Sequence, residues 1–218
     1  MKKNYREDYL KYINYAFIQS DEVFRVNTDT TLLGMFFDEM KAKEVMDIGT
    51  GSGALLLYAH AKGAKKFVGI DIQEEALDLA RINLEKYTKD FELINGNIQN
   101  IEHEKVDVVI CNPPFFEVGS MRKSDNWNKA MFEKTMSLDD MFSAFRKFMK
   151  DNGEVYTLYP ADRFPELYEA ILKYKMKIMR MQFVHDEKRP HALRVILKLK
   201  VGKMTKLKVD KPIIIKRD

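Results

Sequence analysis

Residues 106–116, with the sequence VDVVICNPPFF, decide the fold. Residues 106–111 are five apolar residues and one Asp, a composition typical of a buried strand. Asn112, Pro113 and Pro114 end this strand abruptly, because proline lacks an N–H group and fixes φ. The carboxyl ends of strands are where open α/β sheets bind ligands. The stretch therefore predicts a sheet of this kind with a ligand site at the turn.

The residue types of this turn suit a planar group that carries an NH₂. Asn112 Oδ1 and the Pro113 carbonyl can each accept one hydrogen of such a group, and Phe115 can stack on its face. The alternative interpretation is a loop that two prolines make rigid.

Strands and helices alternate on both sides of this stretch. Upstream, the pattern predicts strands at 44–48, 66–70 and 91–94, and helices at 54–61 and 74–87. Downstream, it predicts helices at 138–149, closed by Asn152-Gly153, and at 164–174, and strands at 155–159, 177–184 and 193–199, with an edge strand at 212–215. Alternation implies a parallel sheet with right-handed crossovers. The strands at 177–184 and 193–199 have no helix between them, so we expect them to be antiparallel.

Residues 1–42 are predicted to form a helical lead-in, because they are too apolar for a free tail. Thr28 or Asp29 is a suitable N-cap for a helix that carries Leu32, Leu33 and two phenylalanines. These two polar residues serve either as a cap alone or also as a cofactor contact.

Composition narrows the class of protein. The chain has 218 residues, of which 45% are hydrophobic, so we expect a single domain, 1–218, with a packed core. No apolar run approaches the roughly 20 residues that span a bilayer, which predicts no membrane association. The single cysteine permits no internal disulfide, and the four histidines lack metal-ligand spacing. We therefore expect a cytoplasmic protein without a metal.

Charge is distributed unevenly along the chain. Residues 170–218 carry a net charge of +11 and the remainder carries −7. A basic C-terminal part of this kind indicates contact with a polyanion such as nucleic acid, although a solvated lysine-rich face would show the same charges. The long irregular segment 117–137, which contains Arg122, Lys123 and Trp127, is predicted to be a substrate-side loop.

A second ligand-binding pattern precedes the first predicted helix of the alternating region. Residues 47–53, DIGTGSG, form a glycine turn that lets a ligand approach the backbone closely, but such turns occur in dinucleotide enzymes and methyltransferases alike. Asp47 places an anion where a cationic ligand fits better than a pyrophosphate. Asp71, 18 residues beyond Gly53, can accept both hydroxyls of a ribose, and Asn97-Ile98 can hold the edge and face of an adenine.

Taken together and in this order, these motifs resemble the class I S-adenosylmethionine-dependent methyltransferases that carry an Asn-Pro-Pro-(Tyr/Phe) motif. Residues 19–34, QSDEVFRVNTDTTLLG, extend the resemblance to the bacterial tRNA1(Val) (adenine(37)-N6)-methyltransferase family. The match covers about residues 20–201. It departs from the family at residues 131–132, where Met and Phe stand in place of Arg and His.

The resemblance implies a Rossmann-like fold, with a mostly parallel seven-stranded sheet, the last strand antiparallel, and helices on both faces. It implies S-adenosylmethionine as cofactor, tRNA as partner, and methylation of adenine N6. The implied catalytic residues are Asn112, Pro113, Pro114 and Phe115. The implied cofactor-binding residues are Thr28, Asp29, Asp47, Gly49, Thr50, Gly51, Gly53, Asp71, Ile72, Asn97, Ile98 and Asn112. The candidate RNA-binding residues are Arg25, Arg122, Lys123, Trp127, Lys188, Arg189 and His191.

Several other functions are alternatives to this one. The same motif occurs in rRNA guanine-N2 methyltransferases and in enzymes that methylate glutamine amides, although the short segment before Asp47 leaves little room for the N-terminal domain of the latter. A nicotinamide-dependent oxidoreductase would need an acid–base pair that we do not find, and the intact Asn112 argues against an inactive RNA-binding module. Cys111 could suggest covalent catalysis, but in an extended strand it points to the opposite face from Asn112 and should face the core.

Overall fold

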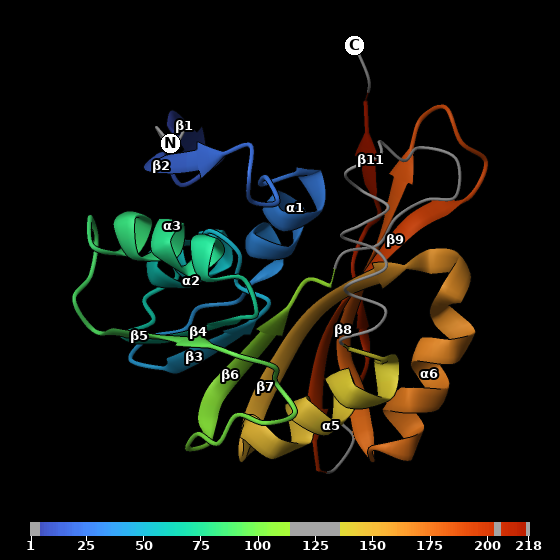
Figure 1. The fold of residues 1–218 in the computed structure, drawn as a ribbon. Coiled ribbons are helices and arrows are strands. Elements are labelled where there is room, and N and C mark those ends of the chain that lie inside the picture. Colours follow the sequence, from blue (N-terminus) through green and yellow to red (C-terminus); the bar gives the residue numbers. More distant parts are fainter. Residues whose placement is uncertain (1–4, 114–135, 203–205, 217–218) are drawn as a thin grey trace.

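A computed structural model describes residues 5–113, 136–202 and 206–216, and its described residues form a nine-stranded sheet and a separate two-stranded hairpin (Figure 1). The strands of the large sheet lie in the order β10-β8-β9-β7-β6-β3-β4-β5, with β11 also beside β8. Seven of these strands are the predicted main strands: β3 (Glu44–Ile48), β4 (Lys66–Asp71), β5 (Phe91–Asn95), β6 (Val106–Cys111), β7 (Met149–Pro160), β8 (Met176–Asp186) and β9 (Ala192–Val201). An eighth, β11 (Ile213–Ile215), is the edge strand predicted at 212–215.

Strand directions agree with the predicted fold class. The five strands β7, β6, β3, β4 and β5 are parallel to one another, each paired with the next in this order. β9 is antiparallel to both β7 and β8, which confirms the expected antiparallel last pair. The two short strands β10 (Lys208–Val209) and β11 (Ile213–Ile215) extend the edge beyond β8. The strand order reverses beside β3, and this switch point is where open α/β sheets bind ligands.

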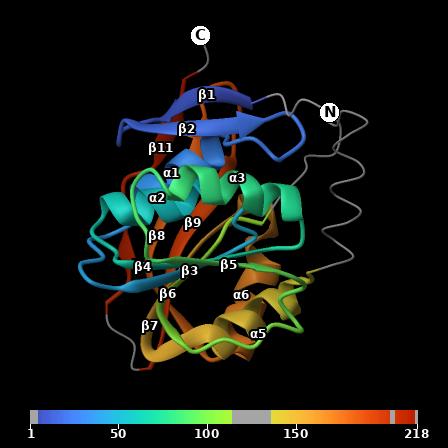
Figure 2. The ribbon, with the colours of Figure 1, turned by 60° about the vertical axis from the view of Figure 1, so that its left-hand side comes forward.

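Helices cover both faces of the sheet, as predicted (Figures 1 and 2). On one face lie α1 (Thr28–Phe36), α2 (Ala54–Ala61) and α3 (Glu74–Leu84); on the other lie α5 (Leu138–Phe148) and α6 (Phe164–Lys173). Side chains of β6 alternate between the two cores: Val108 and Ile110 pack on the α1–α2 side, and Val109 and Cys111 on the α5–α6 side. Because side chains alternate between the two faces along a strand, the Asn112 side chain lies on the face of the sheet that α1 covers.

The prediction of a helical lead-in over residues 1–42 is wrong for its first half. β1 (Tyr5–Leu10) and β2 (Tyr15–Ser20) form an antiparallel hairpin that lies over α3, and only α1 is helical (Figure 1). Aromatic and branched residues favour strands when they have a surface to pack on. The hairpin turn also needs left-handed backbone at Tyr12 and Asn14, where φ is 69° and 59°, and a helix cannot continue through such residues.

Several predicted boundaries also change; α3, for example, ends at Leu84 instead of residue 87. The N-cap of α1 is Asn27, whose Oδ1 accepts a hydrogen bond from Thr30 N–H at 2.9 Å, and not Thr28 or Asp29. Helix α5 ends at Phe148, and Asn152-Gly153 lies inside β7 instead of closing that helix. A β-carbon on Gly153 would stand 2.4 Å from Met149 Cγ, so this glycine permits the backbone to bend tightly within the strand.

Candidate functional site

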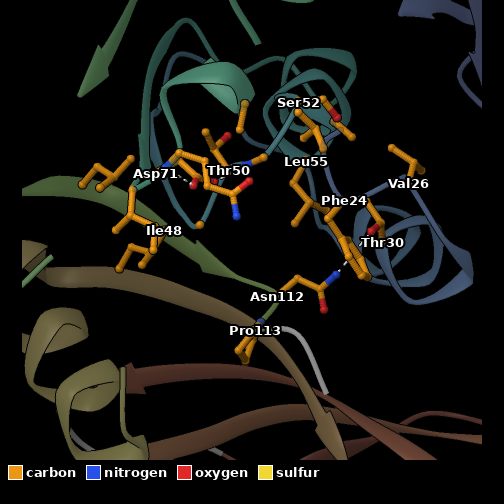
Figure 3. Close-up of a pocket in the computed structure, with 18 of the residues that line it drawn as sticks. Phe24, Val26, Thr30, Ile48, Thr50, Ser52, Leu55, Asp71, Asn112 and Pro113 are labelled. Atoms are coloured by element: carbon orange, nitrogen blue, oxygen red, sulfur yellow. Dashed lines mark hydrogen bonds between the residues drawn. The ribbon is translucent and has the colours of Figure 1, made fainter. Parts of the chain in front are cut away.

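A pocket lies at the carboxyl ends of β3, β4, β5 and β6, beneath the segment that leads into α1 (Figure 3). The glycine turn, Asp71, Gly96 to Ile98, and Asn112-Pro113 line it from the sheet side. Residues 23–27, with Asp29 and Thr30, line it from the opposite side. Motifs that lie up to 90 residues apart in the sequence therefore meet in one cavity.

The glycine turn after β3 leaves the space that a ligand needs. Gly49 and Gly51 adopt left-handed backbone with φ of 74° and 53°, and a β-carbon at either position would contact nothing within 4 Å. The Gly49 and Thr50 N–H groups donate to the Ile70 carbonyl at 2.8 and 3.0 Å, which fixes the turn to β4. Gly53 does not line the pocket; a β-carbon there would stand 3.3 Å from Ala80, so this glycine lets α2 begin close to α3.

Asp71 stands at the end of β4 with its carboxylate held by backbone. Its Oδ2 accepts from Gly51 N–H at 2.8 Å and its Oδ1 from Gln73 N–H at 3.0 Å. Burial raises the pKa of Asp71, while the N–H groups of residues 73, 51 and 72 oppose that rise. Each carboxylate oxygen has further lone pairs, so the fixed carboxylate can still accept ligand hydroxyls. Ile72 lies beside it in the pocket with 40% of its surface exposed.

Asn97 and Ile98 follow β5 and line the same cavity. Asn97 Oδ1 accepts from Gln99 N–H at 3.0 Å, so the NH₂ end of this amide is the part that can meet a ligand. Ile98 is 5% exposed and offers an apolar wall.

Asp47 lies below the pocket and does not line it. It is 1% exposed, and within the described part of the chain neither of its carboxylate oxygens has a hydrogen-bond partner. Burial raises the pKa of Asp47 to about 7, an effect that the nearby Thr50 hydroxyl opposes and the Asp71 carboxylate increases. Among the described residues, the Thr50 hydroxyl oxygen likewise has no hydrogen-bond partner. A buried carboxylate of this kind fits a site for a cationic ligand, because a positive charge would relieve the cost of ionising it.

Asn112 is half-buried at the end of β6 and donates from Nδ2 to Thr30 Oγ1 at 3.3 Å (Figure 3). Pro113 lines the pocket beside it, whereas Cys111 is fully buried in the core on the opposite face, as predicted. Burial raises the pKa of the Cys111 thiol, and the Asp47 carboxylate adds to this rise. A buried, protonated thiol is a poor nucleophile, which agrees with the rejection of covalent catalysis.

Some of the other candidate residues line the pocket and some do not. Thr28 is exposed and does not line the pocket, whereas Asp29 does, with its Oδ2 accepting from Arg194 Nε at 3.0 Å. Arg25 lines the pocket and forms an ion pair with Asp21. The candidates Pro114, Phe115, Arg122, Lys123 and Trp127 lie outside the described residues.

The remaining RNA candidates, Lys188, Arg189 and His191, lie in the connection between β8 and β9. Because β8 runs parallel to β6 and β7, its carboxyl end and this connection are at the same edge of the sheet as Asn112. Several other cations of the basic C-terminal part form ion pairs with acidic side chains. Those in ion pairs are Lys173, Arg180, Arg194, Lys198 and Lys200.

The pocket residues that sequence reasoning missed include Phe24, Asn27 and Thr30. Phe24 lines the pocket with 47% of its surface exposed, near Thr30 and Asn112 (Figure 3). Asn27 and Thr30 stand three residues apart, the spacing of a cap and the N–H it accepts from, and this spacing was the signal available in the sequence.

Within the described residues, no group of histidine, cysteine and acidic side chains is arranged to hold a metal ion, and none of the helices is long and apolar enough to cross a membrane.

Comparison with known proteins agrees with this geometry. The profile of the family described as "Methyltransferase domain" matches residues 39–208. The tRNA1(Val) (adenine(37)-N6)-methyltransferase of Dyadobacter fermentans is 24% identical over 88% of this chain and 82% of its own length. The protein of the same name from Trichodesmium erythraeum is 31% identical over 64% of this chain and 62% of its own length.

Among solved structures, the 16S rRNA N2 G1207 methyltransferase of T. thermophilus, in complex with AdoMet and guanosine, superposes with a TM-score of 0.65 at 16% identity. The superposition covers 91% of this chain and 50% of that one, and at this identity it shows a shared fold only. The family profile spans most of the chain, including every motif of the pocket from the glycine turn to Asn112. The chain belongs to the methyltransferase domain family.

Proposed function

We propose that this protein transfers a methyl group from S-adenosylmethionine to N6 of an adenine in tRNA, at position 37 beside the anticodon of tRNA1(Val). The observation that carries the proposal is that Asn112 and Pro113 share one pocket with the glycine turn and Asp71. The names of the relatives from D. fermentans and T. erythraeum supply the tRNA and the adenine.

The pocket offers separate places for the parts of the cofactor. The backbone of Gly49 and Gly51 borders open space, Asp71 can accept the ribose hydroxyls, and Asn97 with Ile98 can hold the adenine. Asp47 provides negative charge below the turn, which favours the cationic amino acid part. When bound, S-adenosylmethionine supplies an electrophilic methyl group on a sulfonium, which needs no acid to release it.

Asn112 and Pro113 act on the nucleophile. The N6 lone pair of adenine is delocalised into the ring, so N6 is a poor nucleophile on its own. Asn112 Oδ1 and the Pro113 carbonyl accept its two hydrogens, which increases the electron density on N6 and stabilises the positive charge that develops there. With the cofactor bound, the same two acceptors would hold N6 toward the methyl group, and one N6 hydrogen would leave to solvent as N6 gained that group. Pro114 and Phe115 complete the motif, with Phe115 stacked on the extruded base at roughly 1–3 kcal/mol.

The protein surface around the pocket favours an RNA substrate. Arg25 lines the pocket, and Lys188, Arg189 and His191 lie at the same edge of the sheet. We place Arg122, Lys123 and Trp127 in the same interface as part of the segment 117–137. The target adenine lies in a loop, where removing a base from its stack costs only a few kcal/mol. We expect the protein to work in the cytoplasm, where tRNA is found.

The test is nucleoside mass spectrometry of a total tRNA pool incubated with the protein and S-adenosylmethionine. Wild-type protein should produce N6-methyladenosine, and Asn112→Ala should lose about 100-fold or more of the turnover while it still binds S-adenosylhomocysteine. Cys111→Ala is the matched control. Cys111 precedes Asn112 in the sequence, but its thiol takes no part in the proposed reaction, so this variant should keep its activity. Methylguanosine as the product would replace this proposal with a guanine-N2 activity, and full turnover of Asn112→Ala would refute the role of Asn112.

A further inference from the structure

A chain of three hydrogen bonds connects the start of α1 to Asn112. Its first link is the cap of the helix: Thr30 N–H donates to Asn27 Oδ1 at 2.9 Å. A backbone N–H can only donate, so the atom that receives it must be the oxygen of the Asn27 amide and not its nitrogen. The polarity of the chain is therefore fixed at this end by the backbone.

The second link passes through the Thr30 side chain. Thr30 Oγ1 lies 3.2 Å from the same Asn27 Oδ1. An amide oxygen only accepts, so the single hydroxyl hydrogen of Thr30 is directed to Asn27. What the Thr30 hydroxyl can offer to any other neighbour is its lone pairs.

The third link is the contact with Asn112, at 3.3 Å from Thr30 Oγ1. Because Thr30 presents lone pairs there, Asn112 must present its NH₂ group, and its Oδ1 lies on the other branch of the amide, away from Thr30 (Figure 3). With the opposite orientation, two oxygens would face each other across this contact unless Thr30 gave up its bond to Asn27. Thr30 is 8% exposed, so little water is present to compensate such a loss.

We infer that Thr30 is a positioning residue that holds the Asn112 amide with Oδ1 directed at the amino group to be methylated. The inference rests on the proposed function, in which Asn112 Oδ1 accepts a hydrogen from that group. An Asn112 side chain free to turn over would present its own NH₂ to the target NH₂ for part of the time, and two donors repel. Thr30 removes this non-productive orientation without touching the substrate.

The variant that tests the inference is Thr30→Val, which keeps the shape of the side chain and removes the hydroxyl. We expect kcat to fall about tenfold, while KM for tRNA and the Kd for S-adenosylhomocysteine stay within twofold of wild type. Thr30→Ser, which restores the hydroxyl, should recover most of kcat. In the Asn112→Ala background, Thr30→Val should have no further effect, because the amide that it orients is absent.

Thr31→Val is the matched control. Thr31 belongs to the same turn of α1, is also 8% exposed, and donates its hydroxyl to the backbone carbonyl of Asn27 at 3.3 Å instead of to Asn112. A general disturbance of α1 should affect both valine variants alike. Equal loss of kcat in Thr31→Val, or unchanged kcat in Thr30→Val, would overturn the inference.

A second readout does not depend on activity. The side-chain NH₂ of Asn112 gives a pair of ¹H–¹⁵N resonances, assigned by their absence in Asn112→Asp, and Thr30→Val should shift them and speed their exchange with water. Resonances identical to wild type in Thr30→Val would overturn the inference even if the protein proves to methylate guanine or no nucleoside. An inactive wild-type protein with the expected shift would instead count against the proposed function alone.

Discussion

The Asn83 side chain on α3 binds both backbone groups of Ile18 on β2: its Oδ1 accepts from Ile18 N–H at 2.7 Å, and its Nδ2 donates to the Ile18 carbonyl at 3.0 Å. The same Nδ2 donates to the Ser52 carbonyl of the glycine turn at 3.0 Å. Asn83 is fully buried, so this one amide connects the hairpin, α3 and the pocket. Asn83 thereby makes the hydrogen bonds to the Ile18 backbone that a neighbouring strand would otherwise make.

Replacing Asn83 with leucine should therefore destabilise the protein strongly. The change leaves the Ile18 N–H and the carbonyls of Ile18 and Ser52 without their partner, and buried polar groups without partners cost about 1–3 kcal/mol each. We expect urea unfolding to give a free energy of unfolding about 2–4 kcal/mol below wild type. Asn100→Ala, at an exposed position, should remain within 0.5 kcal/mol, roughly the range of surface substitutions. Equal stability of the two variants would contradict the connecting role.

The local sequence pattern was sufficient to predict the alternating strands and helices at the centre of the fold. β3 and α2 have the predicted bounds, and β6 ends at Cys111 as the sequence of its turn requires. Glycines and prolines mark the ends of these strands and helices. The spacing of the apolar residues in each element indicates which of its faces is buried. Nine of the twelve cofactor candidates line the pocket. Eight of them follow the carboxyl ends of adjacent parallel strands, which lie side by side at one edge of the sheet; the ninth, Asp29, lies in α1.

The segment before β3 could not be predicted in the same way, because its partners are distant in sequence. β2 is held by Asn83, 65 residues away, and Asp29 by Arg194, 165 residues away. No window of sequence around Tyr15 or Asp29 contains these contacts. The orientation of Asn112 likewise depends on Thr30, 82 residues upstream, which sequence reasoning did not select.

Glu154 should make stability depend on acid. It is 7% exposed on β7 and forms ion pairs with Lys43, Lys198 and Lys200 at 2.9–3.1 Å. Burial alone would raise the pKa of Glu154, but the lysines outweigh it and lower that pKa to about 2. The folded-state pKa lies below the ordinary value of 4.5, so this stabilisation is complete above about pH 4.5 and is lost as the pH falls toward 2.

Glu154→Gln should accordingly lower the free energy of unfolding by about 2–4 kcal/mol at pH 7, because it removes the carboxylate shared by three lysines and leaves the largely buried Lys198 with Asp38 as its remaining acidic partner. Thermal unfolding followed from pH 7 to pH 2 should show the wild-type Tm approaching that of the variant. Glu102→Gln is the control, since the Lys147–Glu102 pair is exposed and contributes little. A constant difference in Tm between Glu154→Gln and wild type across this range would exclude Glu154 as the source of the pH dependence.

Asp47 should have the opposite effect on stability. Burial raises the pKa of Asp47 from 3.8 to about 7, so the folded protein without ligand binds this proton more tightly than the unfolded chain. The contribution of Asp47 to the free energy of unfolding is therefore most favourable below about pH 3.8, and it decreases as the pH rises toward 7. Asp47→Asn cannot ionise, so its Tm should rise relative to wild type between pH 5 and pH 8.

Cofactor binding should show the reverse trend for the same residue. Ionised Asp47 favours a cation in the pocket, so the affinity of wild type for S-adenosylmethionine should increase from pH 5 to pH 8, and that of Asp47→Asn should be weaker and independent of pH. Isothermal titration calorimetry at several pH values measures both. A pH-dependent affinity retained in Asp47→Asn would assign the titration to another group.

Lys188 should contribute to RNA binding through charge alone. It is exposed in the connection between β8 and β9, at the same edge of the sheet as Asn112. A lysine that contacts phosphate releases about one counterion, so Lys188→Ala should weaken tRNA binding and reduce the slope of log Kd against log salt by about 1. Filter binding at 50–200 mM salt, roughly the range in which such contacts are screened, measures this slope.

Lys105→Ala separates a local contact from a loss of net charge. Lys105 is also exposed and lies immediately before β6, at the opposite edge of the sheet from the pocket. Both variants lower the net charge by one, so a purely global attraction of the basic protein to RNA would give them equal slopes. If the RNA docks at the edge that carries Asn112, the slope for Lys105→Ala should equal that of wild type and only Lys188→Ala should differ.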